Sequence, residues 1–313
     1  MLNYTTCLSL TFIDYIKIES LGKNHIMNHE DIVRVLNDYI QDNPLNFVNE
    51  TDAIYPELAG MQIFELPIVG VASADDPVFT EDFKQDGVIS PRYRGPKEWL
   101  PEARSVISFF LPFTDHVKRS NRKPYDEPYE PGLQQECSAD WLHARIEGQF
   151  FLNQIADNLC SALTSEGYHA ICPTNSGKLE MITPYISTWS ERHAAYAAGL
   201  GTFGLSKGLI TAKGIAGRFG SVITDALLPP TPRPYESPFE YCNMCGACQR
   251  KCPVNAIDKT RGCALGKDQN ICGPYIIAGY LPPHGPNQIE RYGCGKCQCG
   301  VPCESRIPKK INK

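Results

Sequence analysis

The sequence predicts an N-terminal α/β or α+β core that is followed by a small, cysteine-rich C-terminal domain. Three observations lead to this prediction. Apolar segments of strand length alternate with helical segments up to about residue 228. Five prolines then occur within the fourteen residues of "LPPTPRPYESPFEY", which is typical of a stiff, extended linker. Ten of the fourteen cysteines lie beyond it, between residues 242 and 303.

The same observations set the expected domain boundaries: a core at 27–228, a linker at 229–240 and a C-terminal domain at 241–313. The residues before Met27 resemble a signal peptide over a short stretch. They lack an early positive region, however, and Asp14, Lys17 and Glu19 interrupt the apolar residues. We expect residues 1–26 to be a non-native or disordered extension, with a short N-terminal strand as the alternative.

The elements of the core follow from hydrophobic periodicity and from turn-forming residues. Strands are expected where apolar runs are short, and helices where apolar residues recur at helical spacing behind a capping residue. In chain order we expect a helix at 28–43, buried strands at 66–72 and 103–113, a surface loop at 114–137, a helix from Ser138 to about Glu166, a buried strand at 168–173, a helix from Ser190 to Gly199, and a pair of strands at 207–211 and 218–228.

Composition excludes some classes of function. Hydrophobic residues make up 42% and charged residues 21% of the chain, which is ordinary for a soluble protein. The net charge of −5 provides no protein-wide field that would attract nucleic acid, so nucleic-acid binding is not expected. No apolar run reaches membrane-spanning length, and the clustered cysteines do not resemble the disulfide framework of a secreted domain. We therefore expect a cytoplasmic protein that does not bind membranes.

The segment "YCNMCGACQRKCPVNAI" carries the clearest chemical signal. Its cysteines, Cys242, Cys245, Cys248 and Cys252, stand before Pro253 in the order C-x2-C-x2-C-x3-C-P. This spacing is that of bacterial ferredoxins, in which the fourth cysteine ligates a different cluster. Zinc sites use two separated C-x2-C pairs, and cysteines this close in sequence do not easily form disulfides. The segment therefore predicts [4Fe–4S] clusters.

This motif requires four further cysteines downstream, if Cys252 serves a second cluster. Cys294 and Cys297 form a C-x2-C pair, and Cys303 stands apart, where the last cysteine of a ferredoxin returns to the first cluster. We assign one cluster to Cys242, Cys245, Cys248 and Cys303, and the other to Cys252, Cys272, Cys294 and Cys297.

The last ligand of the second cluster has two candidates, Cys263 and Cys272. We prefer Cys272 because "DQNICGPYI" resembles the opening of a helix, whereas Cys263 follows a glycine in an expected turn. Cys299 is expected to be a bystander, because it is too close to Cys297 to reach the same cluster.

A glycine motif in the core requires a separate interpretation. Gly199, Gly201 and Gly204 match G-x-G-x-x-G, but the dinucleotide fingerprint needs a strand before it and a helix after it. Here a predicted helix precedes the glycines and a predicted strand follows them, so a dinucleotide site is not expected. A glycine C-cap and tight turn explains Gly199 alone. Glycines also allow a backbone to approach a large, flat cofactor closely.

The segments "SERHAAYAAGLGTFGLSKGLIT" and "GRFGSVITDALLPP", followed by the ferredoxin run, resemble the epoxyqueuosine reductase family and its relatives, the corrinoid-dependent reductive dehalogenases. The resemblance is best over residues 180–303. It implies an α/β domain that holds a base-off cobalamin, and a ferredoxin-like domain whose two [4Fe–4S] clusters deliver electrons to cobalt. Glu191, Arg192 and the glycines Gly199, Gly201 and Gly204 match the motif that lies beside the corrinoid in this family.

The chain departs from the family at the position of the proton donor. Epoxyqueuosine reductases have an aspartate six residues before the Glu-Arg pair, and this chain has Tyr185 there. A tyrosine donates the proton in the dehalogenases, although a phenol with its ordinary pKa of about 10 needs a cationic neighbour or the cobalt chemistry to be effective. A packing role for Tyr185 is the alternative. The helical-repeat extension of many tRNA-acting members is also absent from this sequence, so we expect a small-molecule substrate.

Two functions follow from these observations. The first is an iron–sulfur oxidoreductase that relays single electrons, from an external donor of the ferredoxin or flavodoxin type, through two [4Fe–4S] clusters to a corrinoid for a reductive reaction on a small substrate. The second is a corrinoid-free, ferredoxin-like electron-transfer protein that serves a partner redox enzyme.

Overall fold

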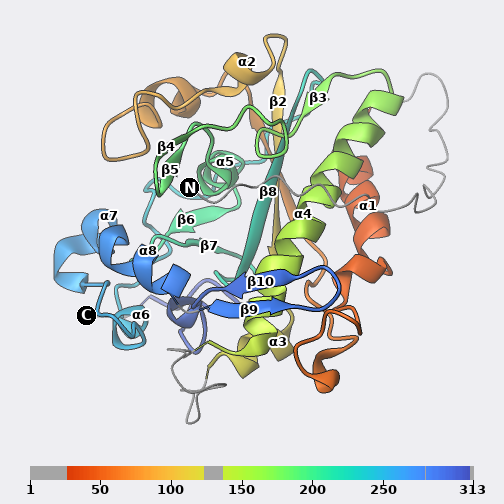
Figure 1. Ribbon diagram of the computed structural model, residues 1–313. Coiled ribbons are helices and arrows are strands. Elements are labelled where there is room, and N and C mark those ends of the chain that lie inside the picture. Colours follow the sequence, from red (N-terminus) through yellow and green to blue (C-terminus); the bar gives the residue numbers. More distant parts are fainter. Residues whose placement is uncertain (1–26, 123–136, 279, 311–313) are drawn as a thin grey trace.

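The computed structural model describes residues 27–122, 137–278 and 280–310 (Figure 1). The expected extension at 1–26 and most of the expected loop at 114–137 lie outside these residues.

The centre of the core is a four-stranded sheet in the order β1-β2-β8-β3. Every pair of neighbouring strands in it is antiparallel, and β2 pairs with β8 from Ser105 opposite Thr224 to Pro112 opposite Gly217. The core is therefore of the α+β kind, which confirms the expected fold class. The strands are β1 (Ile68–Ser73), β2 (Ser105–Pro112), β8 (Gly217–Thr224) and β3 (Ala170–Ile171).

Helices cover both faces of this sheet (Figure 1). Ile107, Phe109 and Leu111 of β2 pack in one apolar cluster with α1 (His29–Ile40) and α4 (Ala139–Ser165). Val106, which directly precedes Ile107, packs on the opposite face with α5 (Glu191–Ala197). Successive side chains of a strand point to opposite faces, so the continuous apolar run of β2 is the expected sequence of a strand that is buried on both sides.

The predicted helices begin where their capping residues stand. The Asn28 side chain accepts hydrogen bonds from the backbone of Glu30 and Asp31, and Asp31 accepts one in return from the Asn28 backbone, so α1 starts with a capping box. Ser138 caps α4, because its side chain accepts a hydrogen bond from the Trp141 backbone N–H. Both helices and the strands predicted at 66–72 and 103–113 are confirmed.

Three details of the sequence prediction are wrong. The start of the predicted loop at 114–137 is a helix, α3 (Asp115–Ser120), because Thr114 caps it and Val117 is buried. The strand predicted at 168–173 is reduced to the half-buried β3, at the edge of the sheet. The strands predicted as a pair lie in different sheets, since β7 (Leu209–Thr211) pairs with β6 (Gly201–Phe203) and β8 joins the central sheet.

The Pro-rich segment 229–240 runs along the outer edge of β1. The Thr231 backbone N–H donates to the Val71 carbonyl over 2.8 Å, and the Val71 N–H donates to Thr231 Oγ1 over 2.9 Å. Among the described residues no helix has both the length and the hydropathy that a bilayer-spanning segment requires.

The remaining elements are short. Those of the core are α2 (Pro96–Trp99), β4 (Met181–Thr183), β5 (Ile186–Ser187) and helical turns at Pro44–Asn46, Pro56–Leu58 and Val78–Asp82. Those of the C-terminal segment are α6 (Ala247–Arg250), α7 (Gly262–Leu265), α8 (Gln269–Ala278), β9 (Tyr280–His284), β10 (Ile289–Tyr292) and helical turns at Lys259–Arg261 and Lys296–Gln298.

Candidate metal centre

Four of the predicted ligands line one pocket, where the C-terminal segment meets β6 and β7. They are Cys242, Cys245, Cys248 and Cys303. The other walls are largely apolar and include Leu205, Ile210, Ile215, Val301 and Pro302. We refer to these four cysteines as the first group.

The first group converges through local backbone geometry. Met244 and Gly246 have left-handed φ angles of 55° and 71°, which turn the loop sharply between its three cysteines. Cys303 arrives from the far end of the chain, and its carbonyl accepts a hydrogen bond of 2.9 Å from the Ile215 backbone. Burial raises the pKa of the Cys303 thiol to about 12, and the thiolates of the other three members raise it further. A positive ion or cluster would relieve this repulsion.

The second group comprises the other four predicted ligands, Cys252, Cys272, Cys294 and Cys297. They come from three segments: Cys252 lies just after α6, Cys272 lies in α8, and the C-x2-C pair of Cys294 and Cys297 follows β10. Burial raises the pKa of Cys294 to about 12, and the thiolates of Cys297, Cys272 and Cys252 all add to this rise. The structure thus gathers the first set around one pocket. The composition of the second set stays a prediction, since Cys297 also raises the pKa of Cys248 in the first set.

Cys263 and Cys299 lie outside the second group. The Cys263 thiol is 3.2 Å from the sulfur of Met244, and it hydrogen-bonds to Cys242, lowering the pKa of Cys242 to about 6. Cys263 therefore accompanies the first group. Cys299 is fully buried in the apolar cluster that contains α4, with the Asn121 amide 3.8 Å from its sulfur. The sequence did not indicate that Cys263 lies beside Cys242.

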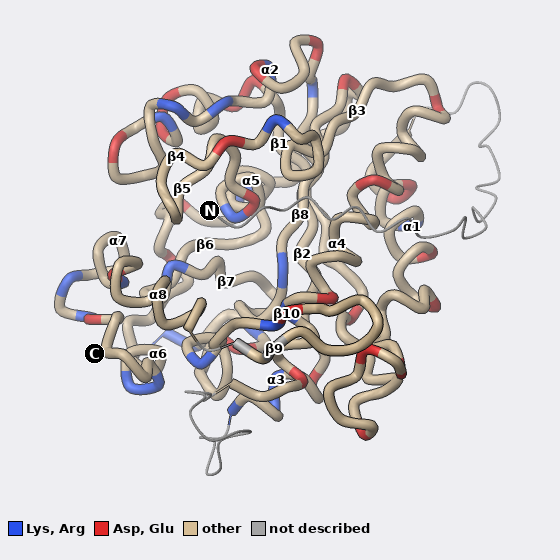
Figure 2. The backbone as a smooth tube through the Cα atoms, viewed as in Figure 1, with Lys and Arg blue, Asp and Glu red and all other residues tan. Residues whose placement is uncertain are grey.

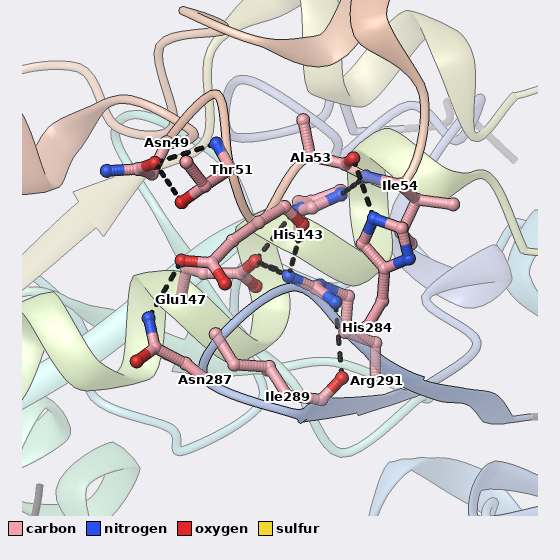
Figure 3. Close-up of polar contacts among 11 residues, drawn as sticks. Asn49, Thr51, Ala53, Ile54, His143, Glu147, His284, Asn287, Ile289 and Arg291 are labelled. Atoms are coloured by element: carbon pink, nitrogen blue, oxygen red, sulfur yellow. Dashed lines mark hydrogen bonds and ion pairs between the residues drawn. The ribbon is translucent and has the colours of Figure 1, made fainter.

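A buried ion pair fastens the β9–β10 hairpin to the core (Figure 3). Arg291 of β10 has no exposed surface, and its Nε donates to Glu147 Oε1 of α4 over 2.9 Å. His143 Nδ1 lies 2.6 Å from the same oxygen. The Ile54 backbone donates to His143 Nε2, so Nδ1 carries the proton toward Glu147. Cys294 follows Arg291 by three residues. The Arg291–Glu147 ion pair therefore holds in place the strand that leads to Cys294.

Further contacts hold the segment around Cys294. The Asn121 amide donates to the Cys294 carbonyl over 2.9 Å. A Cβ atom at Gly295 would lie 2.0 Å from the Trp141 ring, so only glycine allows this close approach. Nearer the C-terminus, Arg122 Nε donates to Glu304 Oε1 over 3.0 Å. The core therefore holds the cysteine-rich segment in place at several points.

The residues predicted to lie beside a cofactor are found on two sides of α5. Glu191 accepts a hydrogen bond of 3.3 Å from Thr174 Oγ1, and burial raises the pKa of its carboxyl to about 8. Arg192 instead lies within electrostatic reach of Cys297, and its side chain is accessible although burial lowers the pKa of its guanidinium.

Tyr185 lies close to the second group. It stands in the β4–β5 turn with 37% of its surface exposed. Its ring packs against Gly273 of α8, where an added Cβ would approach it to 2.3 Å. Gly273 directly follows Cys272, so Tyr185 and Arg192 both lie near the second group.

The glycine motif has partners within this chain. Gly199 has a φ of 79° after α5, and an added Cβ would lie 2.7 Å from the Pro232 carbonyl. At Gly201 a Cβ would lie 2.0 Å from the Ile210 carbonyl, and at Gly204 it would lie 3.1 Å from the Ile210 side chain. Helix capping and the β6–β7 pairing therefore account for these glycines, and no helix follows them as a dinucleotide site requires.

Comparison with known families identifies the segment that contains the first cysteines. A family model described as a 4Fe-4S binding domain matches residues 238–258. This segment is an iron–sulfur domain. No curated protein matches the chain.

Solved structures with a similar arrangement include two epoxyqueuosine reductases and a catabolic reductive dehalogenase. The first reductase, selenomethionine-labelled, has 17% identity and a TM-score of 0.46, over 77% of this chain and 65% of that chain. The reductase from Streptococcus thermophilus has 14% identity and a TM-score of 0.48, over 91% and 69%. The dehalogenase has 16% identity and a TM-score of 0.48, over 91% and 39%. This chain thus spans less than two thirds of the first reductase, and likenesses at this level establish no activity.

The donor sets of both groups fit iron–sulfur clusters. Each offers four thiols, and no described disulfide joins them. The C-x2-C-x2-C-x3-C-P spacing that begins both groups is that of ferredoxins and differs from the two separated C-x2-C pairs of a zinc site. Among the described residues, one trio of metal-binding type includes a histidine. It consists of Glu102, His169 and Asp225, and it lies at the surface, away from both groups.

Proposed function

We propose that this protein is an iron–sulfur reductase that passes single electrons from a low-potential donor through two [4Fe–4S] clusters to a corrinoid, for a reductive reaction on a small molecule. The observation that carries the proposal is the gathering of Cys242, Cys245, Cys248 and Cys303 around one pocket, in a segment that matches a 4Fe-4S binding domain. The second group lies beside Arg192 and Tyr185, the residues predicted to face the cofactor.

The chain would hold the clusters with the first group, Cys242, Cys245, Cys248 and Cys303, and with the second group, Cys252, Cys272, Cys294 and Cys297. Bound clusters would supply one-electron transfer at low potential. Burial raises the pKa of Cys248, Cys294 and Cys303 to about 12, so these thiols must lose protons when iron binds. Cluster assembly therefore releases protons and becomes less favourable as the pH falls.

The proposed corrinoid site lies on the core side of the second group. A bound corrinoid would supply a strongly reducing metal centre that removes a leaving group or an oxygen from the substrate. Two properties of the chain support this site: the Arg192 side chain is exposed, and the partly exposed Tyr185 packs over α8. The Tyr185 hydroxyl would donate the proton that the product requires, with the Arg192 guanidinium supplying positive charge on the same side of the second group.

The cysteines also bear on location. All thirteen cysteines in the described residues are free, and so many unpaired thiols are typical of a reducing compartment. We place the protein in the cytoplasm, with a ferredoxin or flavodoxin as the electron donor.

Cobalt binding tests this proposal. The protein would be purified without oxygen, incubated with cobalamin, separated from free cofactor and analysed for cobalt together with its visible spectrum. We expect about one cobalt per chain and a base-off spectrum. Retained iron without cobalt would contradict the corrinoid site and favour a ferredoxin-like electron-transfer protein. The same cobalt measurement compares Arg192→Gln with a matched control, Arg104→Gln, which changes an exposed cation.

A further inference from the structure

Charge is divided unevenly between the two parts of the chain. The C-terminal segment 241–313 contains eleven lysines and arginines and four acidic residues, which gives it a net charge of +7. The whole chain has a net charge of −5, so residues 1–240 carry −12. Figure 2 shows the contrast in space, with Lys and Arg positions gathered at α6 and Asp and Glu positions along α1. A positive segment on an acidic protein indicates a surface for an acidic partner.

Two exposed cations lie together over the loop of the first group. Arg250 Nη1 donates to the Cys245 carbonyl over 3.1 Å. A Cβ atom added at Gly246 would lie 3.5 Å from that Nη1 and 3.2 Å from Lys259 Cδ. Both side chains therefore pass over the same glycine. The Lys259 backbone is held there by Gln249, whose Oε1 accepts its N–H over 2.9 Å.

The basic tail of the chain lies against the same loop. The Lys309 carbonyl accepts a hydrogen bond of 2.8 Å from Asn243 Nδ2, and Pro308 lines the pocket of the first group. Arg261 ends the helical turn that Lys259 begins, and Lys310 follows Lys309. We refer to these exposed cations as the basic face, which comprises Arg250, Lys259, Arg261, Lys309 and Lys310.

The cations of the basic face are not paired with acidic side chains. None of the five forms a salt bridge within the part of the chain that the structure describes. Asp258, which precedes Lys259, accepts hydrogen bonds from Thr260, and these bonds lower its pKa more than the charge of Arg261 does. Two oxidised cubanes with four thiolates each would add a charge of about −4, so segment 241–313 would stay positive. Water and salt screen exposed charges from the cluster, but these cations can still pair with an incoming partner.

We propose that the basic face is the docking surface of the external electron donor, a small redox protein with an acidic surface. Complementary charge attracts such a partner and fixes its orientation. Docking here brings the redox centre of the donor next to the loop of the first group. The reduced donor loses one electron and the first cluster gains it, with no proton or bond exchanged. That the partner supplies electrons rests on the proposed function.

A nucleic acid fits the basic face less well than a compact acidic protein does. A polyanion extends beyond a patch of five cations, and the charge of −12 on residues 1–240 would repel the remainder. An acidic protein of small size can contact the positive segment alone.

The rate at which reduced flavodoxin reduces the anaerobic two-cluster protein tests this surface. Flavodoxin hydroquinone would be mixed rapidly with the oxidised protein, and bleaching of the clusters followed at several ionic strengths. Lys259→Glu combined with Lys309→Glu reverses two charges and keeps their contacts with the loop, which use backbone atoms. The second-order rate constant at low ionic strength should fall at least about tenfold and lose most of its dependence on salt.

Arg104→Glu combined with Lys178→Glu is the matched control, because it makes the same change in total charge at exposed sites elsewhere. This control should react within about twofold of wild type. Iron content shows that each variant retains its clusters. Arg261→Glu combined with Lys310→Glu repeats the test if the first double variant loses iron.

The proposal is overturned if the variant of the basic face reacts as fast as the control, or if neither flavodoxin nor an acidic ferredoxin reduces the wild type. It is also overturned if an RNA stem–loop binds the wild type, competes with flavodoxin and is lost in the same variant. The proposed function is judged separately, because these rates need no corrinoid. If the protein binds no cobalt but still accepts electrons through the basic face, the corrinoid site fails and the docking surface stands.

Discussion

The two groups of cysteines lie side by side in sequence but differ in how the chain builds them. Three members of the first group come from one loop, and apolar side chains such as Leu205 and Ile215 surround them. The second group draws its members from three separate segments, and Arg192 and Lys267 lie within electrostatic reach of it. A short motif thus specifies the first site almost alone, whereas the second depends on the whole fold.

The difference in charge has a functional consequence. A cation beside a cluster stabilises the reduced, more negative form and raises the reduction potential. We therefore expect the second cluster to have the higher potential. Electrons would then pass from the first cluster to the second, which is the one beside Arg192 and Tyr185. The following predictions are ordered from the largest expected effect to the smallest.

Cys303→Ser should remove or convert the first cluster, since Cys303 supplies the thiol that the loop lacks. Iron should fall from about eight to about four or seven atoms per chain, depending on loss or conversion to a three-iron cluster. Cys299→Ser is the control, because Cys299 is buried in the apolar core, and it should retain both clusters. The opposite pattern would show that the last two cysteines are wrongly assigned.

Cys272→Ser should remove the second cluster in the same way and leave the first intact, which spectra of the reduced protein can distinguish. Cys263→Ser should keep both clusters, since Cys263 hydrogen-bonds to Cys242 and lies outside the second group. If Cys263→Ser rather than Cys272→Ser lost a cluster, the composition of the second group would be refuted.

Arg291→Gln should destabilise the protein near the second group. Removing one partner of a buried ion pair leaves Glu147 uncompensated, at a cost of about 3–5 kcal/mol in the free energy of unfolding. Lys97→Gln, which breaks an exposed pair with Asp75, should cost about 1 kcal/mol or less. Anaerobic urea denaturation measures both. Equal effects would mean that the hairpin does not depend on its buried pair.

Lys267→Gln should lower the potential of the second cluster by roughly 50–100 mV, from a Coulomb contribution of about 1–2 kcal/mol per electron. The first cluster should be unaffected, and so should both clusters in Lys178→Gln, a change at an exposed site. Redox titration followed by electron paramagnetic resonance gives both potentials. An unchanged reduction potential of the second cluster would contradict the electrostatic difference between the two sites.

Much of this account could be predicted from the sequence. Local signals sufficed for the capped helices α1 and α4, for β1 and β2, and for the motif of Cys242. Counting ligands gave the first group, which the structure gathers around one pocket, while the second group stays a prediction. Helix α3 was missed because its polar residues resemble a loop, and its one buried apolar side chain, Val117, gives no periodicity.

Contacts between distant segments were beyond sequence reasoning. Arg291 and Glu147 are 144 residues apart, and each resembles an ordinary surface residue until the fold buries them together. Arg192 was found through a resemblance, but Lys267, which acts on the same cysteines, belongs to no motif. The three glycines were ambiguous for a related reason, since close approach to the Ile210 backbone and close approach to a cofactor demand the same residue.

The iron and acid-labile sulfide contents of the anaerobically purified protein test the central claim most directly. Two groups of four cysteines predict about eight irons and about eight sulfides per chain. About four of each would show that only one group holds a cluster, and would contradict the relay between two sites.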